Sequence, residues 1–385
     1  MFTSCSSQST SEVNVDSSPK KVLPGAYDTE AYIDLLKDKN LALVVNQTSE
    51  ISGVHLVDSL IARSCKISKV FAPEHGFRGD ADAGAQIEDN VDPSTGIPVF
   101  SLYGRKKKPD PSDLEGIDLI VFDIQDVGVR FYTYLSTLHY IIEAAGENNI
   151  PLLVLDRPNP NIRFKEGPVL KEAYSSFVGL HPVPVFTGMT IGEYALMING
   201  EGWTEAQSAC ELQVVPCQNY ARDSLYVLPV KPSPNLPNQN SIYLYASLCF
   251  FEPTSISVGR GTNAPFQHIG HPLFEGMNHS FTPVSREGAT SPKHKDEVCY
   301  GEWLSEIGDK PLGLDLSYLF RYYNLCKEKG IEFMTNERFF DLLAGSSLIR
   351  DALLEGSTSK DLELKWRYEL DAYKAMSEKY HLYAY

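Results

Sequence analysis

The 385-residue sequence has no uninterrupted apolar run of about eighteen residues, the length that a helix needs to span a bilayer. Positive charge is also scarce, because 34 Lys and Arg stand against 50 Asp and Glu and give a formal net charge of −16. A chain this acidic is repelled by nucleic acid and by anionic membranes. We therefore expect neither a transmembrane segment nor a nucleic-acid partner.

The seven cysteines show neither a Cys-x-x-Cys pair nor the spacing of a zinc site. Most of them lie in apolar runs such as Leu248-Cys249-Phe250, which is typical of buried thiols. Cys210 and Cys217 flank a short strand pattern, so a disulfide between them stays open. The histidines show no ligand spacing either, and we expect no bound metal.

Three further motifs are missing. The first predicted strand is followed by Asn46-Gln47-Thr48-Ser49 and not by Gly-x-Gly-x-x-Gly, which argues against a dinucleotide. Neither a Walker A loop nor the Gly-x-Ser-x-Gly of serine esterases occurs. We therefore expect no cofactor and no serine esterase of the α/β-hydrolase type.

The first 24 residues are rich in Ser, Val and Lys without helix or strand periodicity, which is typical of a disordered tether. Within them, Phe2-Thr3-Ser4-Cys5-Ser6-Ser7 resembles the end of a lipoprotein signal, in which the cysteine is lipidated. The basic and apolar regions that precede such a cysteine are missing. Two interpretations stay open, a lipid anchor at Cys5 or a plain Ser-rich tail. The first predicts a location in the periplasm or cell envelope.

From residue 29 onward, helical and strand patterns alternate. Short continuous apolar runs, each ending in polar residues, predict strands that are buried on both faces of a parallel sheet. Strands are predicted at residues 41–45, 69–72, 118–122, 151–155 and 211–215, and helices at residues 30–37, 54–61 and 131–147. The pattern predicts an α/β fold, Rossmann-like and doubly wound, with a mainly parallel sheet.

Past residue 200 the pattern loosens. Strand-like pieces after residue 263 and several helices predict a smaller α+β C-terminal domain. The helices are predicted at residues 240–250, 316–329, 338–344 and 362–380. We therefore divide the chain into a tether (1–24), a Rossmann-like domain that carries the site (25–262) and a C-terminal domain that completes the cleft (263–385).

Ligands of open α/β sheets bind outside the carboxyl ends of the strands. These ends carry many polar side chains, namely Asn46, Gln47, Glu74, His75, Arg78, Asp123, Asp126, Arg130, Asp156, Arg157 and Asn159. Either Asp123 or Asp126 could instead cap a following helix. Asp156 and Arg157 could form a rigid turn held by their own ion pair. Paired carboxylates with arginines and tyrosines nearby fit glycoside hydrolysis.

Several long motifs resemble the exo-β-N-acetylmuramidases, a family formerly filed as a domain of unknown function. The motifs include residues 71–79 around Ala72-Pro73-Glu74-His75-Gly76, residues 122–134, residues 155–160, Glu166-Gly167-Pro168, residues 188–193, residues 232–237 and Gly259-Arg260-Gly261-Thr262. The resemblance implies an enzyme that removes terminal N-acetylmuramic acid from the non-reducing end of peptidoglycan fragments. It also implies a Rossmann-like domain, a smaller C-terminal domain and an active site between them.

By this resemblance Glu74 is the general acid, and we expect Asp123 or Asp126 to be its partner carboxylate. His75 is a base or an orienting residue. The lactyl carboxylate of the sugar calls for an arginine, and the candidates are Arg130, which we favour, then Arg260, with Arg78 and Arg157 behind them. The other predicted substrate-binding residues are Asn46, Tyr132, Tyr134, Asp156, Asn159 and Glu166.

Tyr132 and Tyr134 can both face the site only if they begin a helix. The sequence departs from the family at residues 161–164, which replace a Gly-Gly pair, and at His181-Pro182, which replaces Tyr-Pro. Both departures put the substrate preference in question. Two other functions stay open, a non-catalytic lipoprotein that binds muropeptides and a peptidoglycan amidase or esterase. The last would need a nucleophile or a metal beside His75.

Overall fold

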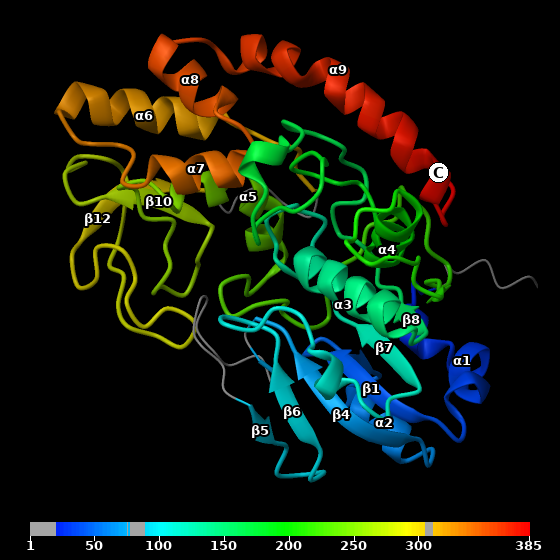
Figure 1. Ribbon diagram of the computed structural model, residues 1–385. Coiled ribbons are helices and arrows are strands. Elements are labelled where there is room, and N and C mark those ends of the chain that lie inside the picture. Colours follow the sequence, from blue (N-terminus) through cyan, green and yellow to red (C-terminus); the bar gives the residue numbers. More distant parts are fainter. Residues whose placement is uncertain (1–20, 75, 78–88, 305–310) are drawn as a thin grey trace, which may run out of the picture.

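The computed structural model describes residues 21–74, 76–77, 89–304 and 311–385. Its largest element is a seven-stranded sheet at one end of the molecule (Figure 1), with strand order β5-β6-β4-β1-β7-β8-β9. The strands are β1 (Asn40–Val45), β4 (Lys66–Ala72), β5 (Asn90–Val91), β6 (Pro98–Ser101), β7 (Leu119–Asp123), β8 (Leu152–Leu155) and β9 (Leu212–Val215). Every neighbouring pair is parallel except β5 with β6.

The six parallel strands follow the doubly wound order. Counted along the chain, they lie in the order 3-2-1-4-5-6, which is that of a Rossmann fold. The predicted α/β fold with a mainly parallel sheet is confirmed. The strand order reverses between β1 and β7, so the space beyond the carboxyl ends of these two strands is where a ligand is expected.

Helices cover both faces of this sheet because its strands are apolar on both sides. In β1 the alternate residues from Leu41 to Val45 pack with α1 and α2. Ala42 and Val44 point the other way, into the cluster that contains α3 and α4. These helices are α1 (Thr29–Leu36), α2 (Leu56–Ile61), α3 (Tyr134–Asn148) and α4 (Ile191–Gly200).

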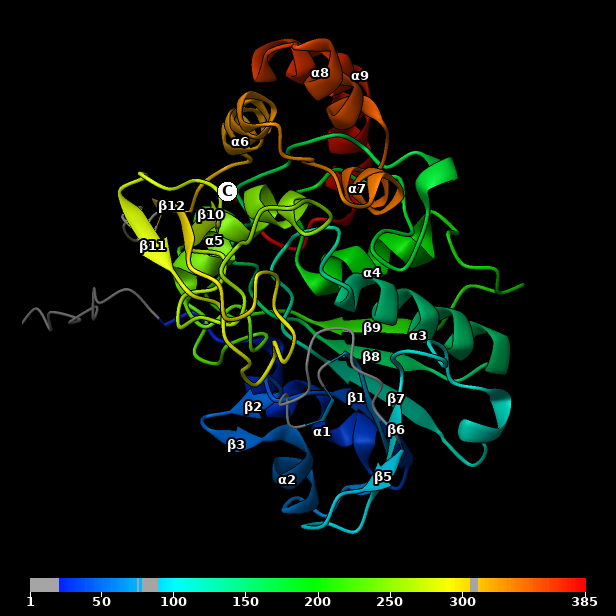
Figure 2. The ribbon, with the colours of Figure 1, turned by 90° about the vertical axis from the view of Figure 1, so that its left-hand side faces the viewer.

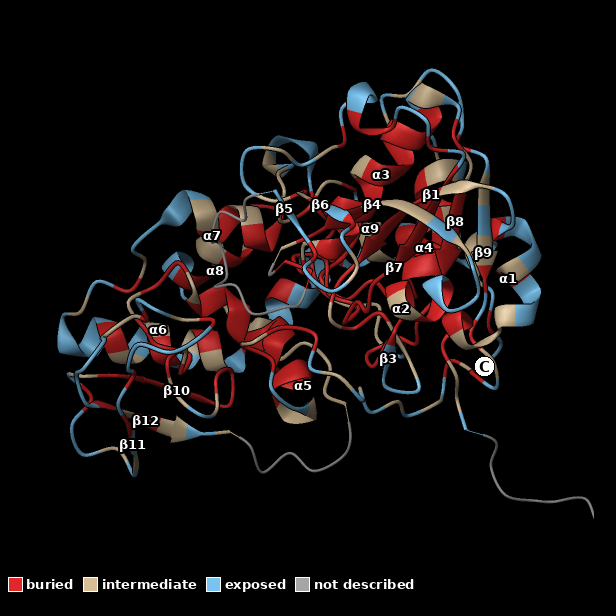
Figure 3. Cartoon of the chain, turned by 90° about the horizontal axis from the view of Figure 1, so that it is seen from below, coloured by how far each residue is buried: buried red, intermediate tan, exposed pale blue. Residues whose placement is uncertain are grey.

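The C-terminal half contains helices and a three-stranded antiparallel sheet of order β10-β12-β11, which confirms the smaller α+β domain. Figure 2 shows α3 and α4 between the large sheet and the helices α6 to α9. The elements are α5 (Gln239–Leu248), β10 (His268–His271), β11 (His279–Phe281), β12 (Cys299–Trp303), α6 (Ser317–Lys329), α7 (Glu337–Ala344), α8 (Leu348–Glu355) and α9 (Ser359–Ser377). Buried residues continue from the large sheet into these helices (Figure 3). The domain boundary at residue 262 stays a prediction.

Two helices, α4 and α8, are missing from the sequence prediction. α4 is buried along most of its length, so it lacks the polar face that marks an amphipathic helix. Its start is nonetheless encoded locally, because Thr190 and Glu193 form a capping box. The smaller elements are the hairpin β2 (Glu50–Ile51) with β3 (Val54–His55) and the 3-10 helices η1 (Gly25–Tyr27), η2 (Pro111–Asp113), η3 (Glu172–Tyr174), η4 (Cys249–Phe251) and η5 (Glu378–Tyr380).

After α9 the chain ends near α4, as Figure 1 shows. The Tyr373 hydroxyl donates to the Thr187 carbonyl at 2.6 Å. The Tyr383 hydroxyl donates to Asp156 Oδ2 at 2.5 Å, so the last turn of chain contacts the loop after β8. This contact fixes the C-terminal half onto the strand ends.

All six cysteines within the described residues are free, including Cys210 and Cys217, so the open disulfide between those two does not form. Five of them are buried, as the apolar runs predict. Among the described residues no helix is both long enough and apolar enough to cross a bilayer. Cys5 lies outside the described residues.

Candidate active site

The loops that follow β1 and β7 are joined where the strand order reverses. Asn46 Oδ1 accepts hydrogen bonds from both the backbone nitrogen and the hydroxyl of Thr48, at 2.9 and 2.6 Å. The same hydroxyl accepts from the Gln125 backbone nitrogen at 3.0 Å. Asn46 therefore fixes the floor of the site, and it is fully buried.

Glu74 follows β4 and is half-buried. Its Oε2 accepts a hydrogen bond from the Thr133 hydroxyl at 2.6 Å. The Tyr103 hydroxyl also bonds this carboxylate; burial is the main cause of the raised pKa of Tyr103, and the charge of Glu74 adds to it. Glu74 thus lies at a strand end with two hydroxyl groups bonded to its carboxylate.

Asp126 lies in the loop after β7 and is buried. Its Oδ2 accepts from the Gly128 backbone nitrogen at 2.5 Å, whereas its Oδ1 has no hydrogen-bond partner among the described residues. Burial raises the pKa of Asp126 to about 7, so this carboxyl can exchange a proton near neutral pH. Burial is the main cause of the raised pKa values of the Tyr132 and Tyr134 hydroxyls, and the charge of Asp126 adds to both.

A row of aromatic rings leads from this floor into the C-terminal half. Tyr134 begins α3, and its ring meets that of Tyr132 edge to face with 4.8 Å between centroids. Both hydroxyls donate to the Pro232 carbonyl, at 3.3 and 2.8 Å. Beyond them Tyr245 lies 5.9 Å from Tyr132 and 5.1 Å from Phe266, again between centroids. Both predicted tyrosines therefore belong to one packed row, as a helix start allows.

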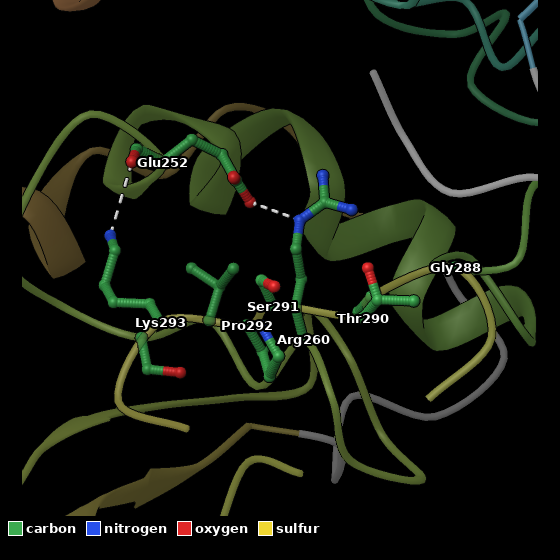
Figure 4. Close-up of a pocket in the computed structure, with 10 residues that line it drawn as sticks. Glu252, Arg260, Gly288, Thr290, Ser291, Pro292 and Lys293 are labelled. Atoms are coloured by element: carbon green, nitrogen blue, oxygen red, sulfur yellow. Dashed lines mark hydrogen bonds and ion pairs between the residues drawn. The ribbon is translucent and has the colours of Figure 1, made fainter. Parts of the chain in front are cut away.

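Arg260 ends this row. Its Nε donates to Glu252 Oε1 at 2.8 Å, and its guanidinium carbon lies 5.1 Å from the centroid of Phe266. Figure 4 shows both terminal nitrogens pointing away from Glu252. The side chain lines a cavity of about 460 Å³. Burial raises the pKa of the Tyr245 hydroxyl, while the charge of Arg260 lowers this pKa and that of Glu74 raises it.

Glycines allow the loop to present Arg260. Gly259 and Gly261 have φ values of 78° and 80°, in the left-handed region. A Cβ atom at Gly259 would lie 2.1 Å from the ring of His268. The Thr262 hydroxyl donates to the Gly259 carbonyl at 2.7 Å and closes the turn. The Gly-Arg-Gly-Thr motif is therefore a backbone requirement for this loop.

Asp123 and Arg157 pair with each other. Arg157 donates from Nε and from a terminal nitrogen to the two oxygens of Asp123, at 2.5 and 2.8 Å. The two side chains are buried and neutralise each other, so neither charge is left for a ligand. The alternative in which Arg157 pairs with its neighbour Asp156 is wrong. Of the two aspartates after β7, only Asp126 keeps an unengaged oxygen.

Asp156 and Asn159 also have structural contacts. Asp156 accepts from the Thr190 hydroxyl and the Gly192 backbone nitrogen, both at 2.7 Å, at the start of α4. Burial raises its pKa to about 7. The Asn159 amide donates to the Met189 carbonyl at 2.8 Å. Both are held within the loop after β8 and offer no group to a ligand.

Arg130 was the favoured partner for a substrate carboxylate, and the structure places it elsewhere. Its terminal nitrogens donate to the carbonyls of Pro168, Val183 and Leu343, at 2.8, 2.8 and 2.7 Å. The residue is 1% exposed, and burial lowers its pKa to about 9. Arg130 ties the N-terminal half to α7, so we withdraw it as a substrate ligand.

Glu166 belongs to a different hollow. Its Oε2 accepts from the Leu314 backbone nitrogen at 2.7 Å. The groove of about 720 Å³ that it lines runs along α9, and neither Glu74 nor Arg260 is among its lining residues. His75 and Arg78 lie outside the described residues.

Sequence reasoning missed Tyr103, Thr133 and Tyr245. Thr133 stands between the two predicted tyrosines, which was a usable signal. Tyr245 comes from α5, and no sequence spacing connects it to β4.

Three comparisons bear on this site. Models of the exo-beta-N-acetylmuramidase NamZ family match residues 41–240 (N-terminal) and 243–383 (C-terminal). The chain is 38% identical over 374 residues to the peptidoglycan beta-N-acetylmuramidase NamZ of Bacillus subtilis (strain 168), covering 91% of this chain and 89% of that protein. Two crystal structures of DUF1343 family proteins from Bacteroides fragilis NCTC 9343 match with TM-scores of 0.87 and 0.82. Their sequences are 39 and 29% identical to this chain. The matches cover 95 and 94% of this chain and 99% of each crystallised chain.

Breaking the buried ion pair will destabilise the protein strongly. Asp123→Ala leaves the charge of Arg157 buried without a partner, so we expect a loss of about 3–5 kcal/mol in the free energy of unfolding. Glu302→Ala is the matched control, because its ion pair with Arg321 is solvent-exposed and should contribute less than about 1 kcal/mol. Urea denaturation measures both. Equal losses for the two variants would contradict the structural role of Asp123.

The buried carboxyl of Asp126 predicts a pH dependence of stability. Its pKa rises from an ordinary value of 3.8 to about 7 on folding, so between these values the folded state binds more protons. Stability must then fall as pH rises through this range. Asp126→Asn removes this contribution, and its urea midpoint should fall less between about pH 4 and pH 7 than that of the unsubstituted protein. Parallel curves for the two proteins would rule out a raised pKa at Asp126. Some decrease in stability with pH should remain in Asp126→Asn, because burial also raises the pKa of Asp156 to about 7.

Proposed function

The chain belongs to the exo-β-N-acetylmuramidase NamZ family, and we propose that its strand-end site hydrolyses the terminal β-linked N-acetylmuramic acid of peptidoglycan fragments from their non-reducing end. It is a glycoside hydrolase. The observation that carries the assignment to this site is Glu74, which follows β4 with its carboxylate among hydroxyl groups.

Glu74 acts as the general acid that protonates the leaving oxygen. The supporting geometry is its place at the strand ends, half-buried and held by the Thr133 hydroxyl at 2.6 Å. A fixed carboxyl is needed because the proton must be delivered to a lone pair of the leaving oxygen as its bond to the sugar breaks. Tyr134 fills the space behind it and donates to the Glu74 carbonyl at 3.5 Å.

Asp126 is the partner carboxylate, since Asp123 is neutralised by Arg157. One of its oxygens is free of hydrogen bonds among the described residues and can accept one from a water or stabilise an oxocarbenium-like transition state. Its pKa of about 7 places proton exchange within the working range of a hydrolase.

Arg260 binds the lactyl carboxylate of the sugar. A guanidinium presents two parallel donors to a carboxylate, and the terminal nitrogens of Arg260 are the ones directed away from Glu252 (Figure 4). The aromatic row from Tyr134 to Phe266 is buried, and its packing sets the distance between this arginine and the Glu74 end of the site.

Replacing the acid will abolish turnover without unfolding the protein. We expect Glu74→Gln to lower kcat on a chromogenic β-N-acetylmuraminide by about 100- to 10,000-fold, because the amide cannot donate the proton. Glu201→Gln is the matched control, since Glu201 also accepts from a hydroxyl, that of Tyr380 at 2.7 Å, but lies at the end of α4. Its activity should be unchanged.

The outcomes separate the candidate functions. Full activity of Glu74→Gln would overturn the assignment of the acid. Calorimetric binding of muropeptides by the unsubstituted protein, with no release from either the muraminide or the matching β-N-acetylglucosaminide, would favour a non-catalytic binding protein.

We further propose that the protein works in the cell envelope, held by a lipid on Cys5. The support is the motif of residues 2–7 and the location of peptidoglycan outside the cytoplasmic membrane. Expressed from its native gene, the protein should partition into the detergent phase of Triton X-114, and Cys5→Ala should move it to the aqueous phase. Cys65→Ala, at a free half-buried thiol, is the control. Aqueous partition of the unsubstituted protein would exclude the anchor.

A further inference from the structure

The turn between η4 and the Arg260 loop leaves several carbonyl groups pointing inward, and one ammonium group collects them. Lys293 Nζ donates to the carbonyls of Phe251, Glu252 and Ile256 at 3.0, 3.3 and 2.9 Å, and also to that of Thr254. Such a cluster of carbonyl oxygens is the environment that binds a cation. Lys293 therefore acts as a covalently attached cation at the centre of this turn.

Glu252 couples this carbonyl cluster to Arg260. Its backbone oxygen accepts from Lys293, while its side chain accepts from Arg260 Nε at 2.8 Å. Figure 4 shows Glu252 between the two cations, with the lysine on one side and the guanidinium on the other. Glu252 and Arg260 have equally covered side chains, each 24% exposed, so this pair is more than a solvated surface contact.

The backbone that carries Arg260 is held separately. Ser257 and Gly270 exchange backbone hydrogen bonds at 2.9 and 3.0 Å, and the Thr262 hydroxyl closes the turn onto the Gly259 carbonyl. With the backbone fixed at both ends of the loop, the direction of the guanidinium depends on two contacts, the ring of Phe266 and the Glu252 carboxylate.

We propose that Lys293 is a positioning residue, which fixes the 251–256 turn, thereby aims Arg260, and so sets the preference of the site for a sugar that bears a free carboxylate. This inference rests on the proposed function of Arg260. Bidentate binding of a carboxylate is sensitive to direction, because both donors must be aligned at once. Displacements of about 1 Å in a binding group can cost about 100-fold in activity.

The test compares two substrates that differ only in that charge, a chromogenic β-N-acetylmuraminide and its lactyl methyl ester. We expect the unsubstituted enzyme to prefer the acid. In Lys293→Met the KM for the acid should rise about 10- to 100-fold, while kcat and the constants for the ester change about twofold or less. A merely structural role would affect both substrates alike.

Lys165→Met is the matched control for the loss of a partly buried lysine. Lys165 donates to the Ser377 hydroxyl at 2.8 Å and contacts His381, on the side of the molecule where the C-terminus packs. Burial lowers the pKa of Lys165 to about 8, as it does for Lys293. Lys165→Met should reduce stability and leave the ratio of the two KM values unchanged.

Chemical rescue keeps the test decisive if Lys293→Met folds poorly. Lys293→Ala removes three carbons and the ammonium group of the lysine side chain. Propylammonium has these same groups and fits the space that they leave. Added propylammonium should restore the acid KM of Lys293→Ala, whereas neutral 1-propanol should not. Rescue by both compounds, or by neither, would overturn the positioning role.

Failures of the two proposals are distinguishable. If the unsubstituted enzyme treats acid and ester alike, Arg260 does not bind the lactyl group and the proposed function of Arg260 fails. If the enzyme prefers the acid and Lys293→Met keeps that preference, the proposal for Lys293 fails and the one for Arg260 stands.

Discussion

The buried ion pair between Asp123 and Arg157 is the interaction on which the site depends. It joins the last residue of β7 to the loop after β8 in a place that water does not reach. Around it the loops after these two strands exchange further hydrogen bonds, from the Gln125 amide to the Pro158 carbonyl at 2.7 Å and from the Asn161 amide to the Val127 carbonyl at 2.9 Å. Asp126 lies within this network, so its burial and its raised pKa follow from how tightly the two loops are joined.

The proposed active site combines groups from both halves of the chain. The proposed acid Glu74 comes from the strand ends, whereas Arg260 comes from the loop that follows η4. The aromatic row of Tyr132, Tyr245 and Phe266 fills the space between them with ring contacts of 5.1 to 5.9 Å. Because both halves share one hydrophobic cluster, the separation of acid and arginine is fixed by core packing.

The fold was predictable because its information is local. Each buried strand is a short apolar run. Polar residues follow these runs, and Asn46, Glu74 and Asp126 became candidates for the site on that ground. The pairing of charges was not predictable. Arg130 donates to carbonyls from three separate segments, the last of them 213 positions away. Only the folded chain decides that Arg130 is internal and that Arg260 lines a cavity, since an arginine in isolation fits either role.

The contact between Tyr383 and Asp156 spans 227 positions of sequence. During synthesis the loop after β8 leaves the ribosome long before its tyrosine partner exists. Until then the buried carboxylate has the donors of Thr190 and Gly192 but lacks its third, the Tyr383 hydroxyl. Contacts of such long range slow folding, because a large loop must close before they form. The loop after β8 therefore gains its last hydrogen bond only when the end of the chain has packed against it.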